Sequence, residues 1–372
     1  MKLAGVLAAG EKRSPLTPDT VKKYKSLGFD VAVEPGLGKG ASITDEAFSA
    51  AGASVEEHPE KGADIVLAAG PLSSETLGRL GAGQRLVGVL EPYDRSEDLN
   101  AFAEHKVDAF AMELVPRITR AQAMDVLSSQ ANLAGYKAII DAASHYGRAF
   151  PMMMTAAGTV PPAKVFVMGA GVAGLQAIAT ARRLGAIVSA TDVRAAAKEQ
   201  VESLGGSFVF AKEAMEEGEG QGGYAKELTE ELRKAQQALI AEHLKKMDIV
   251  ITTALIPGRP APKLIDKTML GGMKSGAVIV DLAAPRGGNV DGDNEAISIL
   301  RPRNILEGLA GEASNLLARN FLSFVTLITD KENGAVAVDP DDDIVKGIQL
   351  TRDGQIVHER FKPQKEAEVS TS

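Results

Sequence analysis

The sequence predicts an α/β protein that contains two doubly wound parallel sheets. Strand-like apolar runs alternate with helix-like segments up to about residue 115, and the same alternation resumes after residue 163. A glycine-rich strand-to-helix turn, Gly169-x-Gly171-x-x-Gly174, opens the second series. The 372 residues are enough to form two domains with separate cores.

The first series predicts strands and helices that are each bounded by turn residues. Thr17 and Pro18 are typical of a helix start, and Gly28 marks the end of that helix. No glycine fingerprint follows the first strand, because Ala8-Ala9-Gly10 lacks the required spacing. The expected strands cover residues 3–7, 30–33, 64–67, 85–89 and 108–112, and the further helices cover 44–51, 74–80 and 96–105.

Residues 120–150 differ from the segments on either side. They contain neither a proline nor a strand-like run, and their apolar residues recur at helical spacing. We predict one long helix here and assign residues 119–150 as a connector between two domains. The next residues, 151–163, are expected to form an irregular passage bounded by prolines.

The second series predicts another parallel sheet. Strands that end at Thr253 and Asp281 would place the loops after them at the carboxyl edge of this sheet. The expected strands cover 165–168, 207–210, 248–253 and 277–281, with a further one that ends at Asp192, and the expected helices cover 198–204, 235–245 and 263–270. A last helix at 313–324 is expected to return the chain to the first domain.

Each glycine of the turn has a physical role in holding a dinucleotide. Gly169 permits the tight turn, and Gly171 lacks a side chain, so the backbone can approach a pyrophosphate. Gly174 lets the helix lie close to the strand, and the helix N-terminus directs its free N–H groups at the anion. The turn therefore predicts a dinucleotide site.

Asp192 ends the strand after the turn, eighteen positions beyond Gly174. Its carboxylate would accept hydrogen bonds from the adenosine ribose and repel a 2′-phosphate, which favours NAD over NADP. Arg194 is a competing signal, because a guanidinium could accommodate a 2′-phosphate. We expect the acid at the strand end to decide the preference.

The uncharged run 165–181 also raises the alternative of a membrane span. The run is short for a span and contains three glycines and Gln176, so a buried strand, turn and helix explain it better.

Composition excludes several classes of site. The chain has no cysteine, which excludes disulfides, thiol nucleophiles and thiolate metal sites, and its five histidines show no metal-ligand spacing, so no metal is expected. A net charge of −8 argues against a nucleic-acid partner. We find no signal peptide and expect a cytoplasmic, cofactor-binding protein.

A polar constellation begins at the predicted connector. On a helix that starts near Ile118, Gln122 and Asp125 lie three residues apart, as do Asp125 and Ser128, so the three share a face beside Arg117. A nicotinamide carboxamide and its ribose offer matching donors and acceptors. The alternative is a solvent-exposed polar face whose residues pair within the helix.

A second polar passage, residues 216–231, is rich in glycine and glutamate and contains Tyr224. A single tyrosine among glycines favours a mobile flap that closes over a ligand. The alternative is a solvated surface loop.

Five stretches carry a family resemblance: MELVPRITRAQAMDVLSSQANLAGYKA, FPMMMTAAGTVPPAKVFVMGAGVAGLQAIATARRLGA, TDVRAAAKEQVESLGG, GGYAKEL and ITTALIPGRPAP. They resemble the NAD(H)-binding component of the proton-translocating NAD(P)+ transhydrogenases, which are related to alanine dehydrogenase. The resemblance covers nearly all of residues 108–284. It implies two Rossmann-like domains joined by long helices. The predicted domains are then 1–118 completed by 312–372, and 151–311.

The resemblance also implies partners. It predicts a homodimer that docks on a membrane-spanning proton-channel component and on a separate NADP(H)-binding component. The chain itself would bind NAD(H), would not cross the membrane, and would lie on the cytoplasmic side of the inner membrane through these partners.

Site residues carry over by position. Arg117, Gln122 and Asp125 resemble the catalytic positions, and Tyr224 resembles the tip of a mobile loop. The cofactor-binding set that the resemblance implies is Arg117, Gln122, Asp125, Ser128, Gly169, Gly171, Val172, Gly174, Asp192, Val193, Arg194, Gly223, Tyr224, Ala225, Ala254 and Leu255.

An alanine-dehydrogenase-like amino-acid dehydrogenase is the enzymatic alternative. Alanine dehydrogenases use a lysine and a histidine of the first domain, but the corresponding stretches 66–72 and 86–93 contain neither residue type. The loop after the Asp281 strand has Pro285 where the dehydrogenase pattern has an acid. A non-catalytic NAD-sensing module is a third possibility. Hydride transfer between two nicotinamides requires alignment and exclusion of water but no general base, which agrees with this composition.

Overall fold

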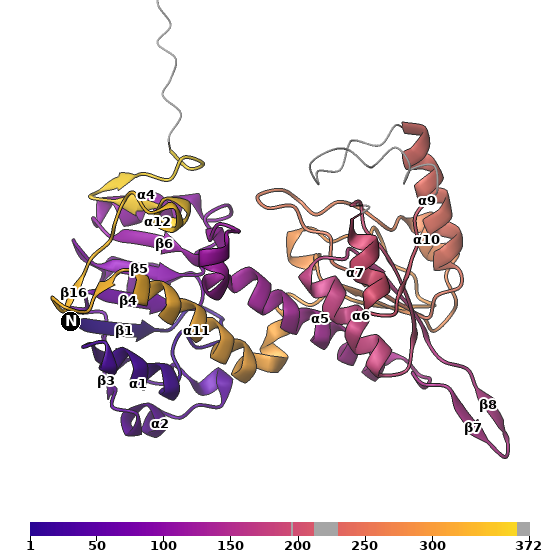
Figure 1. The fold of residues 1–372 in the computed structure, drawn as a ribbon, viewed down its shortest axis with the longest axis horizontal. Coiled ribbons are helices and arrows are strands. Elements are labelled where there is room, and N and C mark those ends of the chain that lie inside the picture. Colours follow the sequence, from indigo (N-terminus) through magenta and orange to yellow (C-terminus); the bar gives the residue numbers. More distant parts are fainter. Residues whose placement is uncertain (195, 212–229, 363–372) are drawn as a thin grey trace, which may run out of the picture. The chain divides into compact units, whose positions relative to one another are not determined.

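The structure is a computed structural model that describes residues 1–194, 196–211 and 230–362. The chain divides into two compact units, which we call the first unit (Met1–Gln130 with the chain from Leu309 onward) and the second unit (Ala131–Gly308). Each unit has a six-stranded parallel sheet with its own apolar clusters (Figure 1). The predicted fold class, with two doubly wound α/β domains, is confirmed. The finer boundaries at residues 118, 150 and 311 stay predictions.

The sheet of the first unit has the strand order β3-β2-β1-β4-β5-β6, and all neighbours are parallel. The order reverses between β1 and β4, which defines the switch point of a doubly wound sheet. β3 was not predicted, because its two residues are both exposed and form no apolar run. The strands are β1 (Lys2–Val6), β2 (Asp30–Val33), β3 (Ser54–Val55), β4 (Ile65–Ala68), β5 (Arg85–Gly88) and β6 (Asp108–Ala111).

Helices cover both faces of this sheet. Tyr24 of α1 and Phe321 of α11 belong to the apolar cluster on one face, and Leu77 of α3 and Phe102 of α4 belong to the cluster on the other face. A capping box between Thr17 and Thr20 begins α1, as the sequence predicts. The helices are α1 (Pro18–Ser26), α2 (Asp45–Ala50), α3 (Ser74–Gly78), α4 (Ser96–Glu104), α11 (Ala310–Leu327) and α12 (Asp343–Ile348), with 3₁₀ helices η1 (Lys39–Ala41) and η2 (Met112–Leu114).

The C-terminal segment packs into the first unit. The ring centroids of Phe324 in α11 and Phe110 in β6 lie 5.4 Å apart. Thr351 is fully buried; its hydroxyl donates to the carbonyl of Val107 (2.7 Å) and accepts from the N–H of Ala109 (3.1 Å). Two short hairpins complete the segment: β15 (Thr329–Asp330) with β16 (Ala335–Val336), and β17 (Thr351–Arg352) with β18 (Gln355–Ile356).

The prediction of one helix from residue 120 to residue 150 is wrong. A 3₁₀ helix, η3 (Thr119–Met124), comes first, and α5 covers only Val126–His145. The two are separated at Asp125, whose backbone (φ −71°, ψ 89°) is not helical and whose side chain accepts the N–H of Ser128. Aspartate caps a helix better than it continues one, which explains the break at Asp125. The prediction missed it because it rested on the spacing of apolar residues, which continues across the break.

The sheet of the second unit repeats the order of the first: β11-β10-β9-β12-β13-β14, all parallel. Ile178 of α6 and Ile139 of α5 lie in the cluster on one face, and Leu244 of α9 and Leu270 of α10 lie in the cluster on the other. The strands are β9 (Lys164–Met168), β10 (Ile187–Thr191), β11 (Ser207–Phe208), β12 (Ile249–Thr252), β13 (Val278–Asp281) and β14 (Ser298–Leu300). The helices are α6 (Val172–Arg183), α7 (Ala197–Ser203), α9 (Glu230–Leu244) and α10 (Lys267–Gly271), with 3₁₀ helices η4 (Ala284–Arg286) and η5 (Ile305–Leu309).

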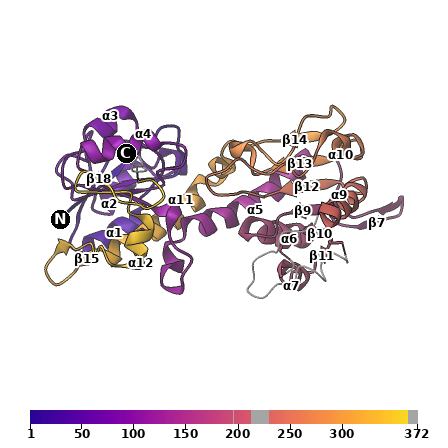
Figure 2. The same cartoon turned by 90° about the horizontal axis from the view of Figure 1, so that it is seen from above.

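The passage after α5 is regular, contrary to the prediction of an irregular one. β7 (Met153–Thr155) and β8 (Gly158–Val160) form an antiparallel hairpin that projects from the second unit in both views (Figure 1, Figure 2). Gly158 has φ +134°, a conformation that glycine adopts readily, and the hydroxyl of Thr155 donates to its carbonyl. The hairpin was missed because its residues are nearly all exposed and show no alternation.

The uncharged run 165–181 forms β9, the glycine turn and most of α6. Within the residues that the structure describes, no helix combines the length and the apolarity that crossing a bilayer requires.

Glu113 of η2 lies at the carboxyl edge of the first sheet; the residue is partly exposed, but one oxygen of its carboxyl group is buried. One carboxylate oxygen accepts the N–H of Glu91, and the other is buried without a partner among the described residues. Glu91 follows β5 and has a left-handed backbone (φ +53°). Burial raises the pKa of Glu113 to about 7, although backbone N–H groups favour the charged form.

We expect Thr351→Val to open the contact between β17 and β6, because it leaves the buried carbonyl of Val107 and the N–H of Ala109 without a partner. The loss should be about 1–3 kcal/mol. Native-state hydrogen exchange of the β6 amides, read by mass spectrometry, measures this opening free energy. Thr326→Val is the control, since in the described part of the chain the Thr326 hydroxyl donates to the carbonyl of Leu322 within the same helix, α11. Equal protection of β6 in both variants would contradict the assignment.

We expect Glu113 to make the stability of the chain depend on pH. The folded state binds the proton more tightly than the unfolded state, where the ordinary value is 4.5. The stabilising contribution is therefore present below pH 4.5 and is lost as the pH rises through about 7, a change of about 3 kcal/mol. Urea unfolding of the wild type and of Glu113→Gln, each at acidic and at alkaline pH, isolates this term. Identical pH dependence of the two proteins would refute it.

Candidate functional site

The glycine turn joins β9 to α6 at the switch point of the second sheet. Gly169 has φ +108°, and a Cβ there would lie 2.4 Å from the hydroxyl oxygen of Thr253. A Cβ at Gly174 would lie 1.8 Å from the carbonyl oxygen of Gly169. A Cβ at Gly171 would meet nothing within 4 Å. The fold therefore requires glycine at 169 and 174, because a side chain there would collide with the protein. The absence of a side chain at Gly171 instead leaves open space at the surface of the turn, as a bound pyrophosphate needs.

The N-terminus of α6 could hold that anion. Gly171 is the N-cap residue, and no side chain caps the helix, so the first-turn N–H groups lack a side-chain acceptor. The first helical residue, Val172, is exposed. Behind the turn, a Cβ at Gly135 of α5 would lie 2.0 Å from the carbonyl oxygen of Ala173, so α5 packs closely against this end of α6. The N-terminus of α6 is therefore held firmly by α5 on its inner side and is accessible to a ligand on its outer side.

Asp192 follows β10 and contacts the turn directly. One carboxylate oxygen accepts the N–H of Ala170 (2.7 Å), and the other accepts the N–H of Arg194 (2.9 Å). Burial alone would raise the pKa of Asp192, but the hydrogen bonds from Arg194 and Ala170 outweigh burial, and the pKa lies below its ordinary value. The group is therefore a carboxylate at neutral pH, suited to accept hydroxyl hydrogen bonds.

Arg194 also pairs with Asp192 through its side chain. Its Nε donates to one carboxylate oxygen (2.9 Å) and its Nη2 to the other (3.1 Å). With the two backbone N–H donors, each carboxylate oxygen of Asp192 thus accepts two hydrogen bonds. The guanidinium is half-exposed and so can move aside, and the neighbouring Val193 is 74% exposed. The sequence did not predict this ion pair, because Arg194 stands out there only as a possible partner of a 2′-phosphate.

The loop after β12 lies beside the turn, as predicted from the strand ending near Thr253. The N–H of Thr253 donates to the carbonyl of Met168 (3.0 Å), and its hydroxyl donates to the carbonyl of Gly169 (3.0 Å). Ala254 follows, and Leu255 and Ile256 are 53% and 44% exposed. Asn289, which the sequence did not single out, bonds the backbone of Ala254. The sequence offered little indication of this role, because Asn289 lies eight residues beyond the end of β13 and its spacing from that strand matches no known motif.

The polar constellation of the first unit differs from the predicted helix face. Gln122 is exposed on η3, and Arg117 is exposed in the preceding segment, where it forms no ion pair with any residue that the structure describes. Asp125 and Ser128 do meet: the N–H of Ser128 donates to one carboxylate oxygen (2.9 Å) and its hydroxyl to the other. The pair thus has a structural role as the cap of α5.

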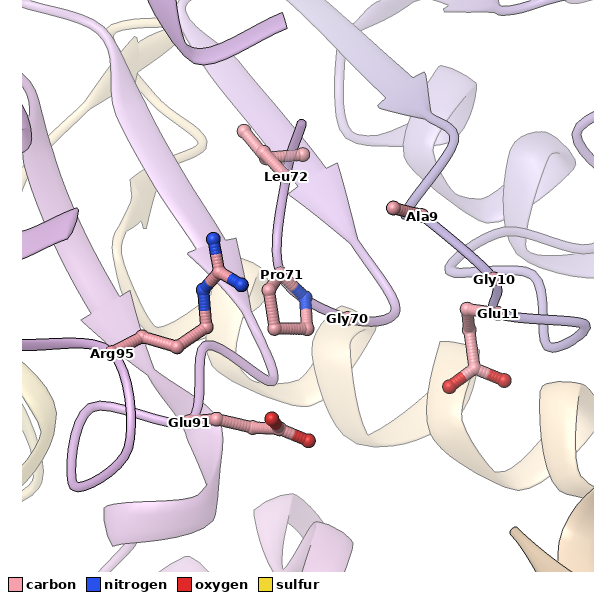
Figure 3. A pocket seen from close by; sticks show the side chains of 8 residues that line it. All are labelled: Ala9, Gly10, Glu11, Gly70, Pro71, Leu72, Glu91 and Arg95. Atoms are coloured by element: carbon pink, nitrogen blue, oxygen red, sulfur yellow. The ribbon is translucent and has the colours of Figure 1, made fainter. Parts of the chain in front are cut away.

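A cavity of about 250 Å³ opens in the first unit at the carboxyl edge of its sheet. Loops after β1, β4 and β5 form its wall, which includes Glu11, Glu91 and Arg95 (Figure 3). Neither lysine nor histidine lines this cavity. Arg95 is paired with Asp98 of α4 (2.6 Å). The wall of the cavity therefore contains neither of the two residue types that alanine dehydrogenases use in their first domain.

The predicted flap residues Gly223, Tyr224 and Ala225 lie outside the described residues. Their role stays a prediction.

Two family models match the chain: the N-terminal domain of alanine dehydrogenase/PNT over residues 7–134 and its C-terminal domain over residues 138–359. An NAD(P) transhydrogenase subunit alpha protein of Rhodospirillum rubrum is 50% identical over 365 residues, which cover 94% of this chain and 95% of that protein. The crystal structure of transhydrogenase from Sinorhizobium meliloti superposes with a TM-score of 0.87 at 47% identity, covering 96% of this chain and 100% of that one.

Alanine dehydrogenase from Mycolicibacterium smegmatis is more distant, at 28% identity over 284 residues that cover 75% of this chain and 70% of that protein. The resemblance to the transhydrogenases is therefore confirmed. Since both domain models match and together span most of the sequence, the chain belongs to the alanine dehydrogenase/PNT family.

Proposed function

We propose that this chain is the NAD(H)-binding component of a proton-translocating NAD(P)+ transhydrogenase. Hydride passes between NADH held by this chain and NADP+ held by a partner component, and the transfer is coupled to proton movement through a membrane-spanning partner. The observation that carries the proposal is the identity of half the residues, over nearly the whole length, with a transhydrogenase subunit alpha.

The second unit would hold the adenosine and pyrophosphate of NADH. Gly171 and the open N-terminus of α6 at Val172 support a pyrophosphate site, since they combine free N–H groups with space. Asp192 would accept the ribose hydroxyls once Arg194 turns away, and its charge would repel a 2′-phosphate. Val193 would contribute an apolar contact beside Asp192, and Ala254 and Leu255 would contribute apolar contacts on the other side of the switch point.

The nicotinamide end would be held by Arg117, Gln122, Asp125 and Ser128. Arg117 and Gln122 offer exposed donors to a carboxamide and a ribose. The bond from Ser128 to Asp125 fixes the carboxylate at the start of α5, so its orientation is set before a ligand arrives. Gly223, Tyr224 and Ala225 are proposed to close over the nucleotide and exclude water.

The reduced nicotinamide supplies the hydride, and the protein has only to align it. No proton needs to move to or from a side chain, which fits the absence of lysine and histidine in the wall of the first-unit cavity. The alternative, an alanine-dehydrogenase-like amino-acid dehydrogenase, would need such a group. A non-catalytic NAD sensor would bind NADH without passing hydride to any partner.

Partners follow from the same proposal. Three consecutive methionines near β7, Met152, Met153 and Met154, are 60%, 43% and 79% exposed on the projecting hairpin. Exposed methionines are typical of surfaces that contact another protein. We infer that this hairpin contacts a second copy of the chain in a homodimer. The dimer would lie on the cytoplasmic side of the inner membrane, held there by the membrane-spanning and NADP(H)-binding components.

We expect direct hydride transfer when this chain is mixed with an NADP+-loaded NADP(H)-binding component. NADH labelled with deuterium at the transferred position should yield labelled NADPH, detected by mass spectrometry, with no label lost to water. The chain alone, given NAD+ and L-alanine, should form no NADH. Alanine-dependent NADH formation would replace the proposal by the dehydrogenase alternative, and NADH binding without transfer would leave only the sensor.

We expect Asp192→Asn to weaken NADH binding about tenfold and to improve NADPH binding, because the amide no longer repels a 2′-phosphate. Fluorescence titration with each nucleotide measures both changes. Asp248→Asn is the matched control: Asp248 is also a carboxylate of the second unit that pairs with a basic side chain, Lys274 in this case. It precedes β12, however, whereas Asp192 follows β10 at the carboxyl edge of the sheet. The proposed role of Asp192 fails if both variants keep the wild-type preference for NADH.

A further inference from the structure

Asn289 is fully buried, and among the residues that the structure describes its side-chain amide bonds to backbone groups of neighbouring loops. Its Oδ1 accepts the N–H of Ala254 (3.1 Å), and its Nδ2 donates to the carbonyls of Ala254 (2.9 Å) and Pro262 (2.8 Å). Its own carbonyl accepts the N–H groups of Leu264 and Ile265. One residue thus fixes both polar groups of Ala254 and the far end of the same loop.

Asn289 is itself held by Asp281, the last residue of β13. One oxygen of this fully buried carboxylate accepts the N–H groups of Asn289 (2.8 Å) and Val290 (3.1 Å). The other accepts the hydroxyl of Thr252 (3.0 Å) and the N–H of Ala283 (3.0 Å). Because every acceptor position is used inside the protein, Asp281 serves to orient the loop and not to bind a ligand.

The loop that Asn289 holds is anchored to the glycine turn on its other side. Thr253 bonds the carbonyls of Met168 and Gly169, so Ala254 stands between two fixed points. The next residues, Leu255 and Ile256, are half-exposed apolar side chains. Exposed side chains on a backbone this constrained form a preorganised wall at the carboxyl edge of the sheet.

The position of this wall relative to the switch point says which half of a dinucleotide it meets. A dinucleotide lies across the crevice where the strand order reverses, here between β9 and β12. Asp192 follows β10 on one side and marks the adenosine half, while Leu255 follows β12 on the other side. We infer that Asn289 is a positioning residue for the nicotinamide half of NADH, acting through the backbone of Ala254. The inference rests on the proposed function of the glycine turn.

The test compares a ligand that reaches both halves with one that reaches only the adenosine half. Asn289→Ala should raise the dissociation constant for NADH about tenfold and change that for 5′-AMP less than twofold, both measured by calorimetry on the full chain. Asn294→Ala is the matched control, because the Asn294 amide also bonds backbone groups, Leu270 and Ala296, but before β14 at the other edge of the sheet. It should change neither constant.

A near-isosteric variant tests the same role without leaving a cavity. In Asn289→Asp an ionised carboxyl keeps the acceptor for Ala254 but repels the two carbonyls. NADH affinity should therefore be low at alkaline pH and recover as the introduced carboxyl takes up a proton and donates again. The phosphate of 5′-AMP itself ionises at about pH 6, so each affinity is divided by that of the wild type at the same pH. The resulting ratio should vary with pH for NADH and stay constant for 5′-AMP, which a general loss of structure would not permit.

The outcomes separate the two proposals. If the wild type binds no NADH, the proposed function itself fails. If the wild type binds NADH and Asn289→Ala binds it equally well, the positioning role fails. It also fails if NADH and 5′-AMP weaken together.

Discussion

The second unit depends on one close approach of backbone to backbone. The carbonyl oxygen of Gly169 occupies the space that a Cβ of residue 174 would need, and the same oxygen accepts the hydroxyl of Thr253. This contact brings α6 down onto β9 and ties the neighbouring strand β12 to the turn. Gly135 repeats the device where α5 meets Ala173. Because backbone atoms cannot yield as flexible side chains do, any larger residue at these positions would displace a whole element.

Much of this architecture could be predicted from the sequence. The buried parallel strands are near-continuous apolar runs, which separate them clearly from the helices. The glycine turn and Asp192 could be recognised because their spacing follows directly from strand and helix geometry. Elements outside the apolar cores were missed: β3 and the β7–β8 hairpin are held by turns and hydrogen bonds and bury little apolar surface.

The polar details of the candidate site could be predicted less well. The break at Asp125 depends on a side chain that caps a helix instead of continuing it, and apolar periodicity does not report that difference. The bonds of Asn289 to Ala254 and of Arg194 to Asp192 depend on how loops fold back after their strands. Loop conformation is set by tertiary contacts, so residue spacing alone could not reveal these partners.

The division of the chain has a consequence for how it folds. The second unit is one continuous segment, so all its contacts can form while later residues are still being synthesised. The first unit cannot complete its apolar cluster until Phe321 and Phe324 have been made. Near the two ends of the inserted segment, Gly308 packs against Lys137, both within the second unit. Residues 131–308 separate the two parts of the first unit in sequence. Once the second unit has folded and its ends are held together, packing α11 onto the N-terminal sheet costs only the entropy of closing a short loop.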